Sequence, residues 1–286
     1  MRAARRRTAT GLALLSPTLL GVAAFFVVPA VALIWMSTQR WDLLSAPRFD
    51  GLASFAAVLA DPATGRALLV TVEIGGIALA VELVLGFALG RLLAAHPAGR
   101  VAAVLLLLPW MIAPLVVGVI ARWIAAPSSG VVAHLLGHRI DVLADPLWAP
   151  VVVAAAMAWQ STGFAAVIYA GSIARIPLEL RDAAALDGAG RWRTIRSVEL
   201  PLLVPTVLFL AIAGVVRAVG LYDLVVPLTG GGPAGATRPL TALIVSWAWG
   251  AGDFGRAAAL SLLVGGVVLV VVAALWLLAR RVDHAR

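Results

Sequence analysis

The chain contains no cysteine and no lysine, and all 22 of its basic residues are arginine. Without cysteine it can form no disulfide, carry out no thiolate chemistry and build no zinc–cysteine site. Without lysine it lacks the phosphate-binding lysine of a P-loop, a Schiff-base lysine and a lysine general base. The chain therefore cannot itself be a P-loop ATPase.

Charge of either sign is scarce. Charged residues make up 13% of the 286 residues and hydrophobic residues 62%, whereas a soluble domain carries about 25% charged residues. Six apolar runs reach the length of about 18 to 20 residues that crosses a bilayer core. They predict an all-α polytopic membrane protein, a single transmembrane domain over residues 1–286 with spans at about 11–36, 67–93, 101–124, 147–174, 202–221 and 257–279.

The first apolar run resembles a signal peptide because four arginines precede it, at Arg2, Arg5, Arg6 and Arg7. Its apolar stretch of about 25 residues is longer than the roughly 7 to 15 of a signal-peptide core. Ala30-Val31-Ala32 is only a weak cleavage pattern. We therefore expect an uncleaved membrane anchor.

The arginines are distributed unevenly between alternate loops. With the N-terminus inside, fourteen arginines fall in inner segments and seven in outer segments, where seven aspartates match them. The positive-inside rule then places both termini and the loop over residues 175–199 in the cytoplasm. Topology and contact with membrane lipid account for the net charge of +8, so nucleic-acid binding is not expected.

The cytoplasmic loop carries a pattern that a plain connector does not need. Pro177 can start a helix, Glu179 and Asp182 lie near its positive N-terminal end, and Gly188 or Gly190 can stop it. The predicted helix has a small alanine face flanked by charges, and a second amphipathic segment can begin at Arg191. The residues leave two interpretations open, a helix that docks on another protein and a solvated loop with orienting arginines.

Polar side chains inside the spans are functional candidates because ionised groups there cost several kcal/mol unless paired or hydrated. Glu82 is the deepest acid, Glu73 lies nearer the outer interface, and Arg217 can pair with Glu82 or line a wet cavity. Two aromatic–polar pairs, Trp159-Gln160 and Tyr222-Asp223, have the chemistry to hold a sugar, and an interfacial belt or packing is the alternative explanation for the aromatics. The candidates for the substrate pathway are Glu82, Trp159, Gln160, Arg217, Tyr222 and Asp223.

Catalytic and metal-binding motifs are missing from the chain, which contains neither H-E-x-x-H nor G-x-S-x-G. A membrane-embedded enzyme is therefore disfavoured, and we predict no catalytic residue. His134 and His138 are spaced as a helical pair beside Asp141 and Asp145 in an outer loop, but we predict no metal site there.

The cytoplasmic loop over residues 175–199 resembles the E-A-A loop of ATP-binding-cassette importer permeases. That loop reads E-A-A-x-x-D-G-A, followed by a hydrophobic position and L-P. The matching residues are Asp182-Ala183-Ala184, Asp187-Gly188-Ala189, Ile195 and Leu200-Pro201, with aspartate in place of the usual first glutamate. The resemblance implies a coupling helix over residues 177–190 that seats in a groove on an ATPase subunit. It implies ATPase coupling for Glu179, Asp182, Ala183, Ala184, Asp187 and Gly188.

Further stretches narrow the resemblance to the carbohydrate-uptake branch, of the maltose and glycerol-3-phosphate type. That branch runs roughly F-D, L-T-x-G-G-P, D-F-G and A-x-S. The corresponding residues are Tyr222-Asp223, Leu228 to Pro233, Asp253-Phe254-Gly255 and Ala259-Leu260-Ser261. The resemblance covers about residues 12–281 and is closest to the permease partner that carries the T-G-G-G-P loop.

The resemblance implies a type I importer permease fold with six transmembrane helices, in a bacterial inner membrane. It implies a sugar importer that works by alternating access, with a second homologous permease, two copies of a cytoplasmic ATPase that hold ATP and Mg²⁺, and an extracytoplasmic solute-binding protein. The chain itself would hold no cofactor. Two alternatives remain, an importer for another small polar solute such as a glycerophosphodiester, and an ion-coupled secondary transporter using Glu73, Glu82 and Arg217.

Overall fold

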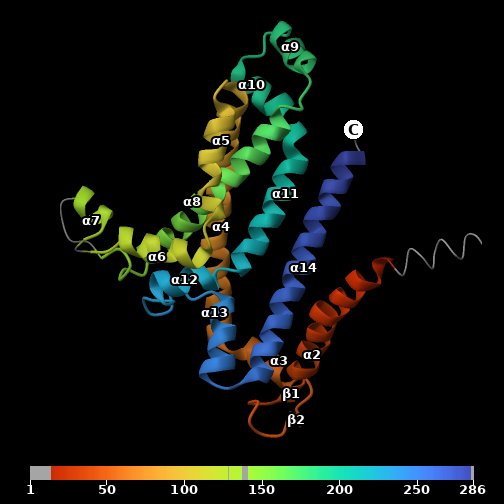
Figure 1. Cartoon of the computed structure of the whole chain (residues 1–286), viewed down its shortest axis with the longest axis vertical. Coiled ribbons are helices and arrows are strands. Elements are labelled where there is room, and N and C mark those ends of the chain that lie inside the picture. The colour runs from red at the N-terminus through yellow and green to blue at the C-terminus, as the bar shows by residue number, and fades with distance from the viewer. Residues whose placement is uncertain (1–13, 128, 137–140, 285–286) are drawn as a thin grey trace, which may run out of the picture. The chain divides into compact units, whose positions relative to one another are not determined.

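The computed structural model describes residues 14–127, 129–136 and 141–284, and these are almost entirely helical (Figure 1). The described residues contain one small antiparallel sheet, made of β1 (Gln39–Arg40) and β2 (Arg48–Phe49). The chain divides into two compact units, one formed by the segment up to Pro62 with Ile244–Val264 and the other by Ala63–Leu243 with Gly265 onward. The expected all-α polytopic architecture is confirmed.

In the first unit, Arg256 links segments that are far apart in the sequence. The elements of this unit are η1 (Ala23–Val27), α2 (Val28–Ser37), α3 (Ala53–Ala60), the end of α13 (Leu240–Val245), η4 (Ser246–Gly250) and the start of α14 (Phe254–His284). Arg256 Nη2 donates to Asp61 Oδ2 at 2.8 Å, and the guanidinium carbon lies 4.5 Å from the Trp247 ring centre. These contacts join segments from the two ends of the sequence.

The second unit contains the remaining helices. They are α4 (Pro62–Ala95), α5 (Gly99–Leu107), η2 (Pro109–Met111), α6 (Pro114–Ile124), α7 (Val131–Leu136), α8 (Trp148–Ile173), α9 (Leu178–Leu186), α10 (Arg191–Thr194), η3 (Ile195–Glu199), α11 (Leu200–Val219) and α12 (Tyr222–Thr229).

Within the described residues, five helices are long and apolar enough to cross a membrane, at Leu14–Ser37, Pro62–Ala95, Trp148–Ile173, Arg191–Val219 and Phe254–Arg281. The fourth of these begins well before the predicted span at 202–221. The second amphipathic segment predicted from Arg191 is therefore not separate: α10, η3 and α11 form one continuous helix.

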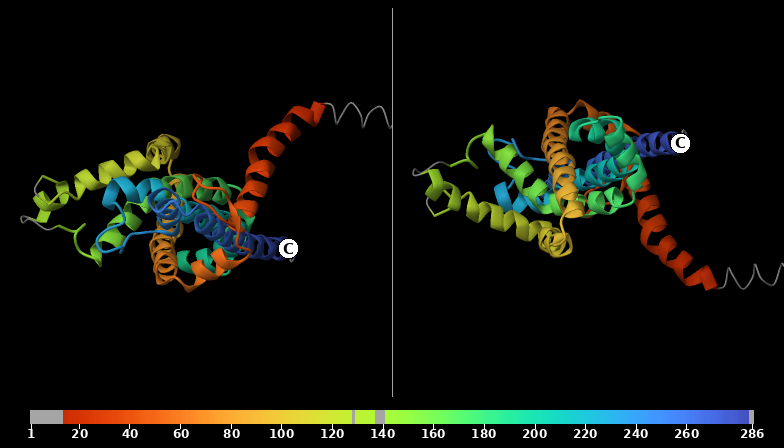
Figure 2. Two further views of the ribbon diagram at one scale, coloured as in Figure 1. Left: turned by 90° about the horizontal axis from the view of Figure 1, so that it is seen from below. Right: turned by 90° about the horizontal axis from the view of Figure 1, so that it is seen from above.

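The predicted span at 101–124 is not a straight helix. Gly99–Met111 and Pro114–Ile124 meet at an angle of 94°, and Figure 2 shows α5 end-on while α6 runs across the view. Proline lacks an N–H and disfavours the helical conformation in the residue before it. Ala113 accordingly has extended backbone, with φ −59° and ψ 139°, ahead of Pro114. A single straight span was the wrong expectation here, because two prolines five residues apart interrupt the helix.

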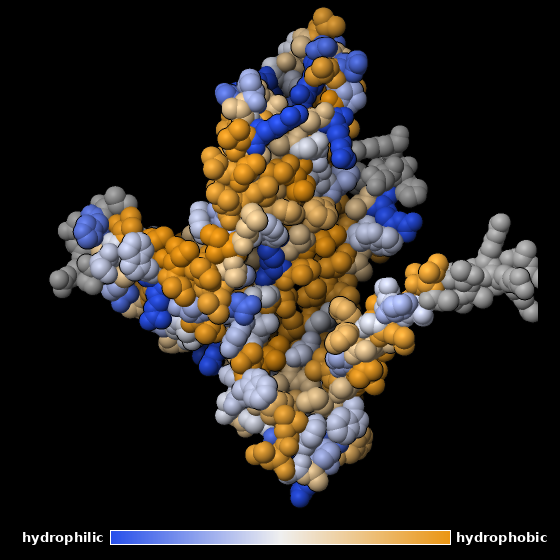
Figure 3. Space-filling model, viewed as in Figure 1, coloured by the Kyte–Doolittle hydropathy of each residue, from blue (hydrophilic) through white to orange (hydrophobic). Residues whose placement is uncertain are grey.

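Small residues let the helices of the second unit approach closely. One buried cluster joins α4, α6, α8 and α12, and another joins α8 and α11. Lipid tails are as apolar as leucine, so helix association in a membrane depends on close packing of small residues. Gly86 and Gly90 of α4 face α8 at Ala165 and Tyr169. Large apolar side chains such as Leu69 and Leu105 remain exposed on the outward faces, which Figure 3 shows as a broad apolar surface.

We predict that Gly90→Ala destabilises the protein by about 1–3 kcal/mol, the usual cost of overpacking. A Cβ at position 90 would lie 2.6 Å from the Tyr169 Cβ and 2.8 Å from the Ala166 carbonyl oxygen. Gly76→Ala on the same helix is the control, because a Cβ there meets nothing within 4 Å. Thermal unfolding of the purified protein in detergent measures both, and equal stability of the two variants would contradict the packing argument.

Candidate functional site

Helix α9 is bounded by residues that suit its two ends. Pro177 is the N-cap, with φ −54° and ψ 135°, so the helix begins one residue later than predicted. At the other end Gly188 has φ +72°, and two hydrogen bonds close the helix, Ala189 N–H to Ala184 O at 2.9 Å and Gly188 N–H to Ala185 O at 3.0 Å. This is the Schellman pattern, which favours glycine in the left-handed conformation. Gly188, rather than Gly190, therefore stops the helix.

Helix α9 is almost entirely exposed. It lies beyond the ends of α5, α8 and α11 (Figure 1), where hydrophilic side chains gather around α9 and α10 (Figure 3). Leu178 and Leu186 are nevertheless 66% and 90% exposed, and Trp192 just beyond is 81% exposed. Of the six predicted coupling residues, Ala184 is partly buried and the other five are exposed. The helix thus presents apolar and acidic side chains together.

The base of α9 contains an ion cluster that was not predicted. Glu199, in η3, is buried and pairs with Arg91 of α4 and Arg181 of α9. Sequence reasoning assigned these arginines to membrane orientation and gave Glu199 no role. The available signal was a carboxylate immediately before Leu200-Pro201, flanked by arginines at the membrane boundary.

At membrane depth the structure pairs Glu82 of α4 with Arg217 of α11. The Glu82 side chain is 1% exposed and that of Arg217 is 20% exposed. The Arg217 guanidinium also lies 5.1 Å from the ring centre of Trp110, which stacks on Phe164 at 4.4 Å. Of the two alternatives for Arg217, pairing with Glu82 is the one observed. The two aromatic residues beside the pair were missed because η2, which carries Trp110, and α8, which carries Phe164, meet only in the folded chain.

The other predicted pathway residues do not converge. Gln160 Nε2 donates to the Ile112 carbonyl at 2.6 Å and so ties α8 to the bend before α6. Trp159 is half-exposed, and Tyr222 and Asp223 lie in the first turn of α12. Among the described residues no side-chain hydrogen bond or ring contact joins the Trp159–Gln160 pair to Tyr222 or Asp223.

The glycine-rich turn after α12 is internally hydrogen-bonded. Gly230 has φ +64° and caps α12. The hydroxyl oxygens of Thr229 and Thr237 lie 2.7 Å apart, and Thr237 also donates to the Gly232 carbonyl at 2.6 Å. The turn is therefore more than a plain connector, since a buried threonine organises it.

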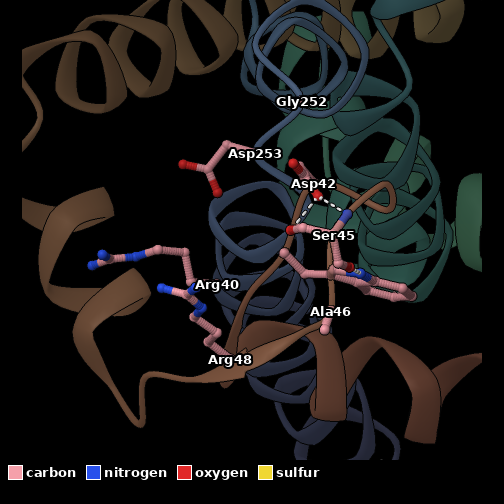
Figure 4. A pocket seen from close by; sticks show the side chains of 8 residues that line it. Arg40, Asp42, Ser45, Ala46, Arg48, Gly252 and Asp253 are labelled. Atoms are coloured by element: carbon pink, nitrogen blue, oxygen red, sulfur yellow. Dashed lines mark hydrogen bonds between the residues drawn. The ribbon is translucent and has the colours of Figure 1, made fainter.

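A cavity of about 260 Å³ lies in the first unit (Figure 4), lined by Arg40, Trp41, Asp42, Ser45, Ala46, Arg48, Gly252 and Asp253. The Asp42 carboxylate accepts hydrogen bonds from the backbone N–H and hydroxyl of Ser45, both at 2.7 Å, and from the Leu44 N–H at 3.0 Å. These hydrogen bonds lower the pKa of Asp42 below its ordinary value, and the two from Ser45 have the largest effect. In the described part of the chain no three acidic, histidine or cysteine side chains form a metal-binding group. His138 of the predicted pair lies outside the described residues.

A family model described as the inner membrane component of binding-protein-dependent transport systems matches residues 82–284. The chain belongs to this family. The permease resemblance inferred from the E-A-A loop is confirmed.

Two curated relatives match the permease over most of its length. MalF, a trehalose/maltose transport system permease protein of Thermococcus litoralis, is 28% identical over 271 residues, covering 92% of this chain and 91% of the relative. UgpA, an sn-glycerol-3-phosphate transport system permease protein of Agrobacterium fabrum, is 30% identical over 272 residues, covering 91% of each.

Solved structures share the fold of the permease. A bacterial ABC transporter involved in the import of the acidic polysaccharide alginate matches with a TM-score of 0.83 and 22% identity, over 98% of this chain and 99% of that chain. The type I importer fold expected from the sequence is confirmed.

We predict that Glu82→Gln and Arg217→Gln each destabilise the permease by about 3–5 kcal/mol, because each leaves a buried partner without its counter-charge or hydrogen bond. The double variant should lose less than the sum of the two single losses, as residues in contact do. Unfolding of the purified permease in detergent measures the cycle. Glu73→Gln, at an exposed acid on the same helix, should have little effect, and additive losses in the cycle would show that the pair does not stabilise the fold.

Proposed function

We propose that the permease is one of two homologous membrane subunits of an ATP-driven, binding-protein-dependent importer of an uncharged sugar. Two copies of a cytoplasmic ATPase subunit dock below the permease pair, one of them on the loop that contains α9, and an extracytoplasmic solute-binding protein delivers the sugar. The observation that carries this proposal is α9 itself, a capped helix that exposes leucine and acidic side chains beyond the ends of α5, α8 and α11.

The exposed leucines support docking rather than solvation. Burying a leucine side chain contributes about 1.5–3 kcal/mol relative to leaving it in water. Leu186 is 90% exposed beside the exposed Asp182 and Asp187, so this chain does not cover it. A groove on another protein would cover it, and the carboxylates of Glu179, Asp182 and Asp187 would provide specific polar contacts at its rim.

The mechanism we propose is alternating access. ATP binding closes the two ATPase subunits, α9 moves with them, and the membrane helices open the pathway outward; hydrolysis resets it inward. ATP can drive this change only through different affinities for the two conformations. ATP and Mg²⁺ belong to the ATPase subunits, and this chain contributes no cofactor and no catalytic group.

The pair formed by Glu82 and Arg217 favours an uncharged solute. An arginine free to face the pathway would attract an anionic group, as a glycerophosphodiester importer needs. Here the Arg217 charge is matched by Glu82 and packed against Trp110. The relatives include both trehalose/maltose and glycerol-3-phosphate permeases, so this pair is the feature on which we base the choice of a neutral sugar. Ion coupling through Glu82 is also disfavoured because the negative charge of its carboxylate is already paired, through Oε2, with Arg217.

The arrangement in the membrane follows from the arginines. We propose a bacterial inner-membrane protein whose two termini and α9 loop are cytoplasmic, because the inner segments carry fourteen arginines against seven in the outer segments.

We predict that Asp182→Arg and Gly188→Asp lower both sugar uptake and binding-protein-stimulated ATP hydrolysis by at least about tenfold, within the usual range of coupling energies. The first reverses a charge on the exposed face, and the second places a charged side chain at φ +72°, where a residue with a Cβ is disfavoured relative to glycine. Reconstituted complex in liposomes measures both activities. Asp182→Glu, which retains the charge, is the control and should remain near wild type. Wild-type activity of both variants would show that α9 does not couple to the ATPase.

We predict that the complete transporter, with its own binding protein, takes up a neutral disaccharide such as trehalose or maltose and that excess glycerol 3-phosphate does not compete. Competition in a radiolabelled uptake assay would favour the anionic alternative. Uptake of neither solute would assign the transporter another sugar.

A further inference from the structure

A buried carboxylate lies where the α9 loop rejoins the membrane helices. Glu199 is 4% exposed and lies within the continuous helix Arg191–Val219. Arg91, near the end of α4, donates Nη1 to Glu199 Oε2, and Arg181 of α9 places Nη2 3.6 Å from Glu199 Oε1. One carboxylate thus holds two guanidinium groups that come from two other helices.

Arg181 also contacts the opposite side of the loop. Its Nη2 donates to the Ile173 carbonyl oxygen at 3.3 Å, at the last residue of α8. Carbonyl groups at a helix C-terminus have no partner within the helix and carry partial negative charge, so a cation there is favourable. Arg181 therefore bridges the end of α8 and the buried carboxylate of the next spanning helix, the two helices that the loop connects.

The backbone that follows α9 is poorly suited to transmit movement of this helix to the next one. The chain leaves α9 through Gly188 and Gly190, and glycine is the residue with the greatest backbone freedom. Within α9 only Arg181 and Ala184 are not fully exposed. The Arg181 side chain is consequently the main attachment of α9 to the helices behind it.

We propose that Glu199 is a positioning residue that transmits displacement of α9 to α4 and to the Arg191–Val219 helix together. This inference rests on the proposed docking of α9 on the ATPase subunits. Moving the two arginines away would leave the buried Glu199 carboxylate without a counter-charge, so the cluster resists being pulled apart. When the ATPase subunits move α9, Arg181 carries Glu199 with it, and Arg91 carries the end of α4.

The test is Glu199→Gln in the reconstituted transporter. Glutamine keeps the shape and removes the charge, and because Glu199 is buried the docking surface is unchanged. We expect ATPase subunits to co-purify and basal ATP hydrolysis to persist, while stimulation by sugar-loaded binding protein and sugar uptake fall at least about tenfold. Glu199→Asp keeps the charge and should retain most of the stimulation, which a purely steric role would not produce.

Arg181→Met provides a second variant that leaves the pair between Glu199 and Arg91 intact. It should show the same loss of stimulation, and combining it with Glu199→Gln should add little, because both interrupt one connection. Arg100→Met is the matched control, since Arg100 is an exposed arginine at the start of α5, outside the α9 loop, and it should remain near wild type.

The outcomes separate this inference from the proposed function. Wild-type stimulation in both Glu199→Gln and Arg181→Met overturns the inference, and the docking role of α9 stands if Asp182→Arg still uncouples the transporter. Loss of assembly in Glu199→Gln with normal stimulation in Arg181→Met also overturns it, by assigning Glu199 to folding alone. Wild-type activity of Asp182→Arg would instead remove the proposed function itself.

Discussion

An arginine that enters an apolar environment needs a carboxylate, and in this protein such pairs join helices that are far apart in the sequence. Arg217 of α11 holds Glu82 of α4, and Arg91 of α4 holds Glu199 ahead of α11. The same helix pair is thus linked at two places along its length. The chain has no cysteine and so no disulfide, and these ion pairs link helices that are far apart in the sequence. They are costly to break, because separation leaves a buried charge without its partner.

Around these pairs the helices pack through small residues, and the packing leaves the functional surface free. Glycines of α4 bring it against α8, and the ion cluster at Glu199 holds the base of the α9 loop. Helix α9 then extends beyond the ends of α5, α8 and α11 with its leucines exposed. Coupling needs both parts: the exposed helix α9 must bind the partner, and the ion cluster at the base of the loop must transmit the partner's movement.

Local patterns predicted much of this structure. The spacing of acids, alanines and glycine placed a helix near 177–190, and the observed α9 differs only where Pro177 caps it and where Gly188 rather than Gly190 ends it. The bend at Ile112–Ala113 was missed, although Pro109 and Pro114 were visible. A proline in a transmembrane run permits a straight helix, a kink or a break, and the surrounding helices decide among them. Gln160 supplies one such contact here by binding the Ile112 carbonyl.

The sequence by itself determined the class of protein, the apolar spans, the bias of arginine towards one side, and the E-A-A loop. These depend on composition, run length and short-range spacing, which a linear chain displays directly. Only the tertiary structure decided which charges pair. From the sequence, Arg217 could pair with Glu82 or line a wet cavity, and Glu199 had no assigned role. The partners in these pairs are 135 residues apart for Arg217 and Glu82 and 108 residues apart for Arg91 and Glu199, and they meet only through helix packing. The energy of a buried charge depends on those neighbours, and no local pattern records them.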